Sequence, residues 1–144
     1  MAFFDERIRD EGMEGSNFRS RILVLIAIVF GFAGVVAGAL GAHPPEGFLT
    51  EQASREAWNS GVYFLLFHVV VILACADLRS FSIKPFGVAS VFFLCGILFF
   101  SGSIFLLAAG GPKGIGPVTP LGGLFLLFGW VALGYQVMRQ RSAS

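Results

Sequence analysis

Six polar side chains could do chemistry in an otherwise strongly apolar chain. They are His43, Asn59, His68, Ser101, Ser103 and Thr119. A histidine can transfer a proton, contact a ligand or bind a metal or a haem, and hydroxyl or amide groups can hold a polar solute. His68 lies in the middle of an apolar stretch, where ionisable residues are costly and are functional candidates by default. We therefore take the six residues as a candidate polar site.

Each of these residues also has a structural interpretation. His68 can be a neutral imidazole that bonds to a backbone carbonyl or to Ser101 or Ser103 across a helix interface. Serines in membrane helices usually bond back to the carbonyl four residues earlier, and Thr119 can cap the helix that follows it. For His68 the functional and the structural interpretation both stay open.

An enzyme is not predicted. His43 and His68 differ in expected depth by roughly 15 Å at helical rise, which is too far for both to bind one cofactor. The apolar stretches hold no carboxylate, so neither a metal centre nor an acid–base pair can be assembled there. We expect no catalytic residues, no metal and no cofactor.

The composition is that of a membrane protein. The chain has 144 residues, of which 56% are hydrophobic and 13% charged, whereas a soluble domain carries about 25% charged residues. The net charge of +1 gives no basic field for a nucleic acid. These values exclude a soluble globular domain, a disordered chain and a nucleic-acid binder.

Four stretches without charge are long enough to cross a hydrocarbon core of about 30 Å as helices. They are residues 22–42, 57–76, 85–110 and 115–138. Their continuous apolarity favours helices over the alternating strands of a barrel. The sequence thus predicts an all-α polytopic membrane protein, a bundle of four transmembrane helices that forms one membrane domain over residues 21–141.

The ends of the chain and the first loop lie outside these spans. Residues 1–20 are predicted to form a loosely ordered tail or a short amphipathic helix on the membrane or on a partner. Residues 142–144 form a C-terminal tail. In the first loop, residues 48–58 are predicted to form an interfacial helix that runs into the second span.

The distribution of Lys and Arg predicts the orientation of the bundle. Eight of these residues lie in the terminal segments and the second loop: Arg7, Arg9, Arg19, Arg21, Arg79, Lys84, Arg139 and Arg141. Only Arg55 and Lys113 lie in the first and third loops. Both termini are therefore expected in the cytoplasm, and the first and third loops are expected to face the periplasm or the cell exterior. His68 then lies about 16 Å below the outer surface, beneath the other polar candidates.

Small residues in two spans predict close helix packing. In the first span they recur at spacings of 4, 3, 4 and 3 and form one stripe: Ala27, Gly31, Gly34, Gly38 and Gly41. In the last span Gly122, Gly123 and Gly129 are similarly permissive. Either set of small residues can pack closely against a helix of this chain or of a partner.

Several motifs, in order, resemble one family. They are residues 38–43 (GALGAH), Trp58, residues 61–68 (GVYFLLFH), residues 100–103 (FSGS), residues 119–123 (TPLGG) and Gly129 with Trp130. Over about residues 21–138 the chain resembles the domain-of-unknown-function 423 family, small bacterial inner-membrane proteins similar to the eukaryotic transmembrane protein 256. The resemblance implies four membrane helices and no known activity. Phe64 and Phe105 stand where the family usually has tyrosine, and the charged tail is not typical of it.

Two functions are predicted. The first is a non-enzymatic accessory or assembly component that packs against other membrane subunits or against itself, in contact with lipid. The alternative is a transporter-like protein that binds a small solute, an ion or a lipid, with an outward-facing polar cleft that ends at His68.

Overall fold

The computed structural model describes residues 2–77 and 87–141, and within them the side chains of residues 21–76 and 87–139. Its elements are α1 (Ala2–Ala42), α2 (Gln52–Asp77), α3 (Val88–Ala108), the short 3-10 helix η2 (Lys113–Ile115) and α4 (Val118–Arg141). The described residues contain no strand, and four helices are long and apolar enough to cross a membrane. The predicted all-α class with four membrane-crossing helices is confirmed.

The helix bounds differ from the predicted spans at several ends. The first loop is short because α2 already begins at Gln52, so the expected interfacial helix and the second span are one helix. Helix α1 continues back to Ala2 through the predicted tail, and Gly12 and Gly15 do not interrupt it. The predicted start of the third span at residue 85, the second loop and the tail 142–144 lie outside the described residues.

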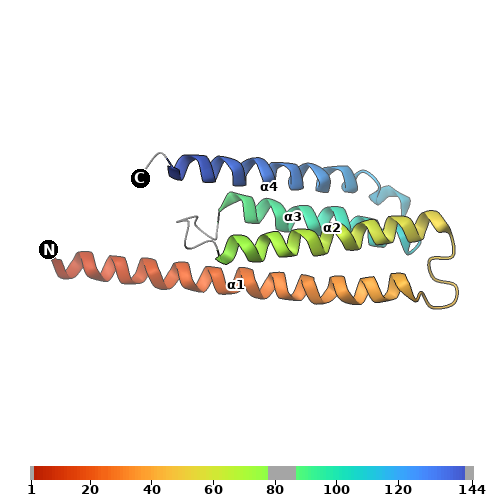
Figure 1. Cartoon of the computed structure of the whole chain (residues 1–144), viewed down its shortest axis with the longest axis horizontal. Coiled ribbons are helices and arrows are strands. Elements are labelled where there is room, and N and C mark those ends of the chain that lie inside the picture. Colours follow the sequence, from red (N-terminus) through yellow and green to blue (C-terminus); the bar gives the residue numbers. More distant parts are fainter. Residues whose placement is uncertain (1, 78–86, 142–144) are drawn as a thin grey trace.

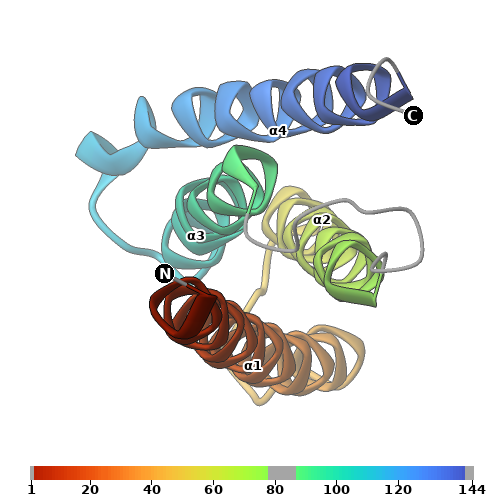
Figure 2. The ribbon, with the colours of Figure 1, turned by 90° about the vertical axis from the view of Figure 1, so that its left-hand side faces the viewer.

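The helices alternate in direction, so that α1 begins and α4 ends at the same end of the bundle (Figure 1). Seen end-on, α2 and α3 lie side by side, α4 lies beyond α3, and α1 lies on the opposite side (Figure 2). The extensive contacts join α1 to α2, α2 to α3 and α3 to α4. The bundle is therefore a chain of neighbouring pairs, and α2 and α4 are not tightly joined.

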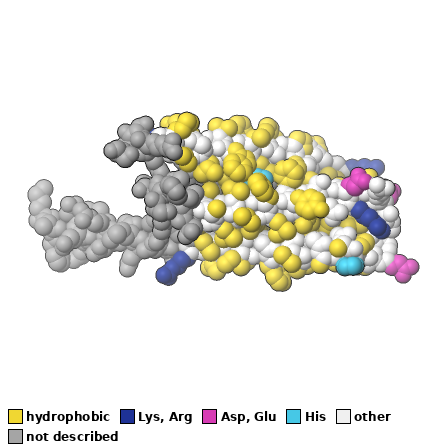
Figure 3. Space-filling view, viewed as in Figure 1, with side chains coloured by type: hydrophobic (Ala, Val, Ile, Leu, Met, Phe, Trp, Pro, Cys, Tyr) yellow, Lys and Arg dark blue, Asp and Glu magenta, His cyan; other side chains and the backbone are white. Residues whose placement is uncertain are grey.

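The hydrophobic core is built from all four helices. Its largest fully buried side chain is Phe93 of α3, which packs in one cluster with Ala89 and Ile97 of the same helix. The cluster also contains residues of every other long helix: Leu23, Ala27, Leu65, Val69, Ile72 and Leu126. The outer flank is hydrophobic, and charged side chains gather at the ends (Figure 3). A lipid environment explains this apolar outer surface, because a membrane protein has apolar side chains on the surface that faces lipid as well as in its core.

Glycines allow α3 and α4 to approach closely. A β-carbon at Gly122 would lie against the backbone of Phe100, and one at Gly96 would meet the side chain of Leu126. A β-carbon at Gly129 would lie 2.6 Å from the ring of Phe93. Gly122 and Gly129 of α4 therefore face α3.

The small-residue stripe of α1 faces α2. Ala27 is fully buried in the core. A β-carbon at Gly34 would lie 2.6 Å from Leu66 Cδ2, and one at Gly41 would lie 2.7 Å from Trp58 Cδ1. Within this seam Trp58 Nε1 donates a hydrogen bond of 2.7 Å to the carbonyl of Ala37. That bond joins the two helices near the end that carries the first loop.

The turn after α3 also needs a glycine. Gly110 has φ of +86°, a left-handed conformation that glycine adopts without steric cost. Its N–H donates to the carbonyl of Leu107, and the N–H of Gly111 donates to that of Leu106. These two bonds form a Schellman motif, which ends α3 and directs the chain into η2.

Candidate functional site

His68 lies on α2 with its side chain in the middle of the bundle. Only 3% of its surface is exposed. Aromatic rings surround it on several sides: the ring centroid of Phe67 lies at 5.1 Å, that of Phe93 at 5.5 Å and that of Trp130 at 6.3 Å. The imidazole is thus enclosed by side chains from α2, α3 and α4.

The hydrogen bonding of His68 defines its tautomer. Its Nδ1 atom lies 2.8 Å from the carbonyl oxygen of Phe64, one turn earlier on α2. A carbonyl can only accept, so Nδ1 carries the proton, and in the neutral ring Nε2 is a bare acceptor. That Nε2 atom is buried and has no hydrogen-bond partner among the described residues. The backbone-carbonyl interpretation therefore accounts for one ring nitrogen only.

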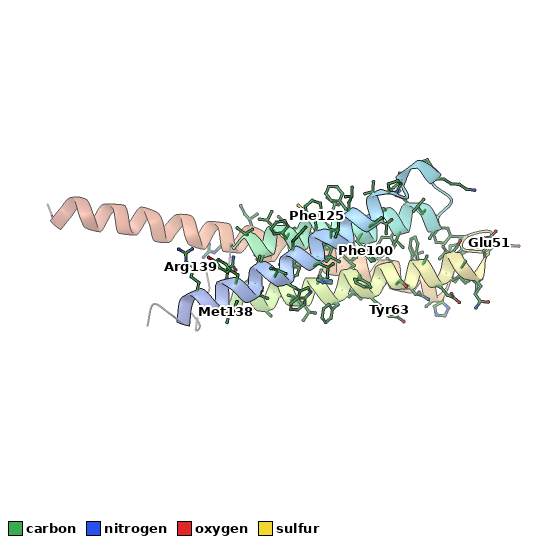
Figure 4. All side chains as sticks on the ribbon, turned by 90° about the horizontal axis from the view of Figure 1, so that it is seen from above. Glu51, Tyr63, Phe100, Phe125, Met138 and Arg139 are labelled. Atoms are coloured by element: carbon green, nitrogen blue, oxygen red, sulfur yellow. The ribbon has the colours of Figure 1, made fainter. Side chains whose placement is uncertain are left out.

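A groove of about 870 Å³ lies beside His68, between α2 and α4. Its wall on α2 consists of Tyr63, Phe64, Phe67 and His68, its wall on α4 includes Leu124, Leu127 and Trp130, and Phe100 of α3 completes it. In a view from above, Phe100 lies between α4 and α2, and Tyr63 projects outward from α2 (Figure 4). The groove exists because α4 packs closely on α3 and leaves a space towards α2.

The lining of the groove is almost wholly apolar. Of the side chains that line it, only His68 and Tyr63 carry a hydrogen-bonding group beyond the indole N–H of Trp130. The groove beside His68 is therefore apolar, and His68 is the one of the six polar candidates that lines it. An apolar groove suits a hydrophobic occupant and does not suit a hydrated ion.

Two of the other candidates pair with each other. Ser103 Oγ donates to the carbonyl of Phe100 at 3.0 Å and lies 2.7 Å from Thr119 Oγ1. A hydroxyl has one proton, and Ser103 uses its proton for Phe100, so Thr119 is the donor to Ser103. This pair joins α3 to the first turn of α4, which makes it a helix–helix contact.

The remaining candidates lie apart from the groove. Asn59 faces α1, because a β-carbon at Gly41 would lie 2.9 Å from its Oδ1 atom. His43 is exposed just beyond the end of α1. Ser101 is buried on α3, and its Oγ atom has no partner among the described residues. The structure therefore brings Ser103 and Thr119 together, and of the six candidates it places only His68 in the lining of this groove.

Sequence reasoning missed the aromatic wall around His68. Phe64, Phe67 and Trp130 were available as lipid-facing residues, and nothing in their spacing distinguishes a groove wall from a lipid face. A signal was present for Phe64, which lies four residues before His68 and therefore on the same face of the helix. Among the described residues, no group of three or more His, Cys, Asp or Glu side chains could hold a metal ion.

Comparison with known proteins places the chain in a family. The family model described as "Protein of unknown function (DUF423)" matches residues 37–123, which is more than half of the chain. The chain belongs to the DUF423 family. The resemblance seen in the sequence motifs is therefore confirmed, and the matched range contains the whole of α2 and α3 and all six polar candidates.

Curated relatives of the family are named as membrane proteins. A "UPF0382 membrane protein" of Haemophilus influenzae is 34% identical over 127 residues, which cover 86% of this chain and 98% of the relative. The "UPF0382 inner membrane protein YgdD" of Escherichia coli K12 is 37% identical over 79% of this chain and 87% of the relative. The "UPF0382 membrane protein YwdK" of Bacillus subtilis is 27% identical over 78% and 93%.

These relatives and the four spans establish where the protein resides. It is a multi-pass protein of the bacterial inner membrane and contacts lipid. No solved structure matches the chain. The names of the relatives assign a location and no activity, so function has to be argued from this chain.

Proposed function

We propose that the protein is a non-enzymatic accessory or assembly component that packs against other membrane subunits. The observation that carries this proposal is the length of α1. It has 41 residues, which at helical rise is about 60 Å, or twice the thickness of a hydrocarbon core. Helix α1 extends well beyond the end of the other three helices (Figure 1).

The sequence of this extension supports a protein partner. Residues 2–20 carry five acidic and three basic residues: Asp5, Glu6, Asp10, Glu11 and Glu14 with Arg7, Arg9 and Arg19. A segment of mixed charge is poorly suited to an anionic lipid surface, which attracts purely basic segments. A protein partner that carries both signs of charge suits this extension better than a lipid surface does.

The polar side chains support the same proposal. The hydrogen bonds of Trp58 with Ala37 and of Ser103 with Thr119 join helices to one another. These groups stabilise the bundle and are not free to act on a substrate. We therefore propose a packing role without catalytic activity.

Purification in a mild detergent from native membranes tests the proposal. We expect the full chain to migrate in a complex larger than a single four-helix chain, and a variant that lacks residues 2–20 to migrate alone. A matched control keeps the length of α1 and replaces only the charged residues of the extension by Gln or Asn, which separates the need for charge from the need for length. A full chain that migrates as a lone monomer would contradict the proposal.

We also propose that both termini lie in the cytoplasm. The bias of Lys and Arg supports this orientation, and an even number of spans puts both ends on one side. Fusions of a periplasm-active phosphatase to the C-terminus and to the loop at Lys113 test it. We expect an inactive fusion at the C-terminus and an active one at Lys113, and the reverse result would overturn the orientation.

A further inference from the structure

We propose that the groove beside His68 binds a membrane-soluble phenol, a molecule with a hydroxyl on an aromatic ring and an apolar tail, whose hydroxyl donates a hydrogen bond to His68 Nε2. This inference is independent of the accessory role, because it concerns the membrane-embedded flank between α2 and α4 and not the extension of α1. It would hold for a protein with or without partner subunits.

The unpartnered nitrogen of His68 identifies the polar part of the ligand. Its Nδ1–H group already donates a hydrogen bond to the carbonyl of Phe64, so the neutral ring offers a single acceptor at Nε2. A buried acceptor without a partner costs about 1–3 kcal/mol, and His68 lines the groove. The ligand therefore needs one hydrogen-bond donor, and a second polar group would find few partners in this lining.

The aromatic lining identifies the part of the ligand that carries the donor. Phe64 stacks on His68 at an interplanar angle of 14°, with ring centroids 6.0 Å apart. Trp130 lies edge-on to His68 from the opposite helix, at an interplanar angle of 64°. Phe100 packs on Phe64 with centroids 4.6 Å apart. Rings arranged in this way favour another aromatic ring, which gains stacked and edge-to-face contacts.

The position and size of the groove account for the apolar tail. The groove lies on the flank between two membrane-crossing helices, α2 and α4, so its occupant arrives from the hydrocarbon region. Its volume of about 870 Å³ is at the upper end for small-molecule sites and holds more than a single ring. Leu124 and Leu127 of α4 offer contacts to an alkyl or isoprenoid chain, whereas a charged headgroup would find no counter-charge in this lining.

Binding of two matched probes tests the donor. The purified full chain, in detergent and with a tag free of histidine, is titrated with para-octylphenol and with its methyl ether, which has the same ring and tail but no donor. We expect the phenol to bind about tenfold more tightly, which corresponds to one hydrogen bond to a buried acceptor. Equal affinity for the two probes would overturn the proposal.

Nitrogen NMR tests the contact without disturbing the groove. With histidine labelled in nitrogen-15, the variant His43→Gln leaves His68 as the single labelled side chain, and His43 is exposed and away from the groove. We expect the phenol to shift the Nε2 resonance and the ether to leave it in place. A phenol that binds without moving this resonance would place the ligand elsewhere and overturn the proposal.

Two substitutions and one control locate the site. His68→Phe removes the acceptor and should abolish the difference between the probes. Gly123→Leu should block both probes, because Gly123 lines the groove and a β-carbon there is only in ordinary contact with Phe100, at 3.7 Å. Gly134→Leu is the control, because it makes the same change on the same helix at a position with no atom within 4 Å of a β-carbon.

A protein occupant is the rival outcome. Leu124→Cys, made in a chain whose free Cys75 and Cys95 are replaced by Ala, places a single thiol in the groove wall. A maleimide–benzophenone reagent attached to this thiol in native membranes would, on illumination, crosslink it to a helix of another chain that fills the groove. Such a crosslink, together with failure of both probes to bind, would overturn the proposal and assign the groove to a protein interface. An uncrosslinked thiol that octylphenol protects from alkylation supports the proposal.

Discussion

The two sides of α2 differ sharply. Towards α1 it forms a closed seam, in which Gly34 and Gly41 bring the backbones together and Trp58 bonds across to Ala37. Towards α4 it leaves an open groove, walled by Phe64 and Phe67. Small residues on one helix let its neighbour approach closely, whereas the α4 wall of the groove has one glycine, Gly123, among the larger Leu124, Leu127 and Trp130. The comparison shows that glycine placement determines which helix pairs close.

The largest effect is expected where a glycine meets backbone. Gly122→Ala places a β-carbon against the backbone of Phe100, which cannot move aside as a side chain can. We expect a loss of about 3 kcal/mol in the free energy of unfolding, measured by denaturant titration in mixed micelles. Gly134→Ala is the control on the same helix and should change stability by less than about 0.5 kcal/mol, because nothing lies near its β-carbon.

A smaller effect is expected in the seam between α1 and α2. A β-carbon at Gly34 would meet Leu66 Cδ2, the end of a flexible side chain that can rotate away. We expect Gly34→Ala to cost about 1.5 kcal/mol. Gly31→Ala should be nearly neutral, because its β-carbon would be in ordinary contact with Val69 at 3.4 Å. Equal losses of unfolding free energy in the two variants would contradict the interpretation that the close approach of α1 and α2 at Gly34 stabilises this helix pair.

The hydrogen bond across the same seam contributes less. Trp58→Phe keeps the aromatic packing on Phe105 and removes the donor to Ala37. We expect a loss of about 1 kcal/mol, as for a neutral hydrogen bond. Trp130→Phe is the matched change at the open groove, where the side chain is 43% exposed, and should cost less. If the Trp130 variant were the less stable of the two, the groove would have to be the more tightly packed region.

The smallest effect is expected for the hydroxyl pair between α3 and α4. A double-mutant cycle with Ser103→Ala and Thr119→Val isolates their interaction, which we expect to be about 0.6 kcal/mol. The same unfolding titration measures it. A coupling near zero would mean that the 2.7 Å contact adds nothing to what glycine packing already provides between these helices.

Much of this fold could be predicted from the sequence, because each span is a continuous apolar run and apolar length decides whether a helix crosses a membrane. The stripe that begins at Ala27 was visible because its spacing follows one helical face. The depth of His68 could be calculated from helical rise. Orientation about each helix axis could not be calculated, and so Asn59, expected in the polar site, faces α1 instead.

The groove was not predictable for a related reason. It results from which helices pair, and pairing depends on the fit of Gly96 against Leu126 and of Gly122 against Phe100. These contacts join residues whose partners cannot be read from either span alone. Once α4 is fixed on α3 in this way, the aromatic residues of α2 become the opposite wall.

The pairing of each helix with its neighbour in the sequence has a consequence for biogenesis. Because the extensive contacts join α1 to α2, α2 to α3 and α3 to α4, each of α2, α3 and α4 leaves the ribosome when a helix that it contacts extensively has already been made. Assembly can therefore proceed during translation, hairpin by hairpin, with few contacts that must wait for a distant segment. Helix α4 docks last of the four helices, and the groove beside His68 forms only once α4 has packed on α3.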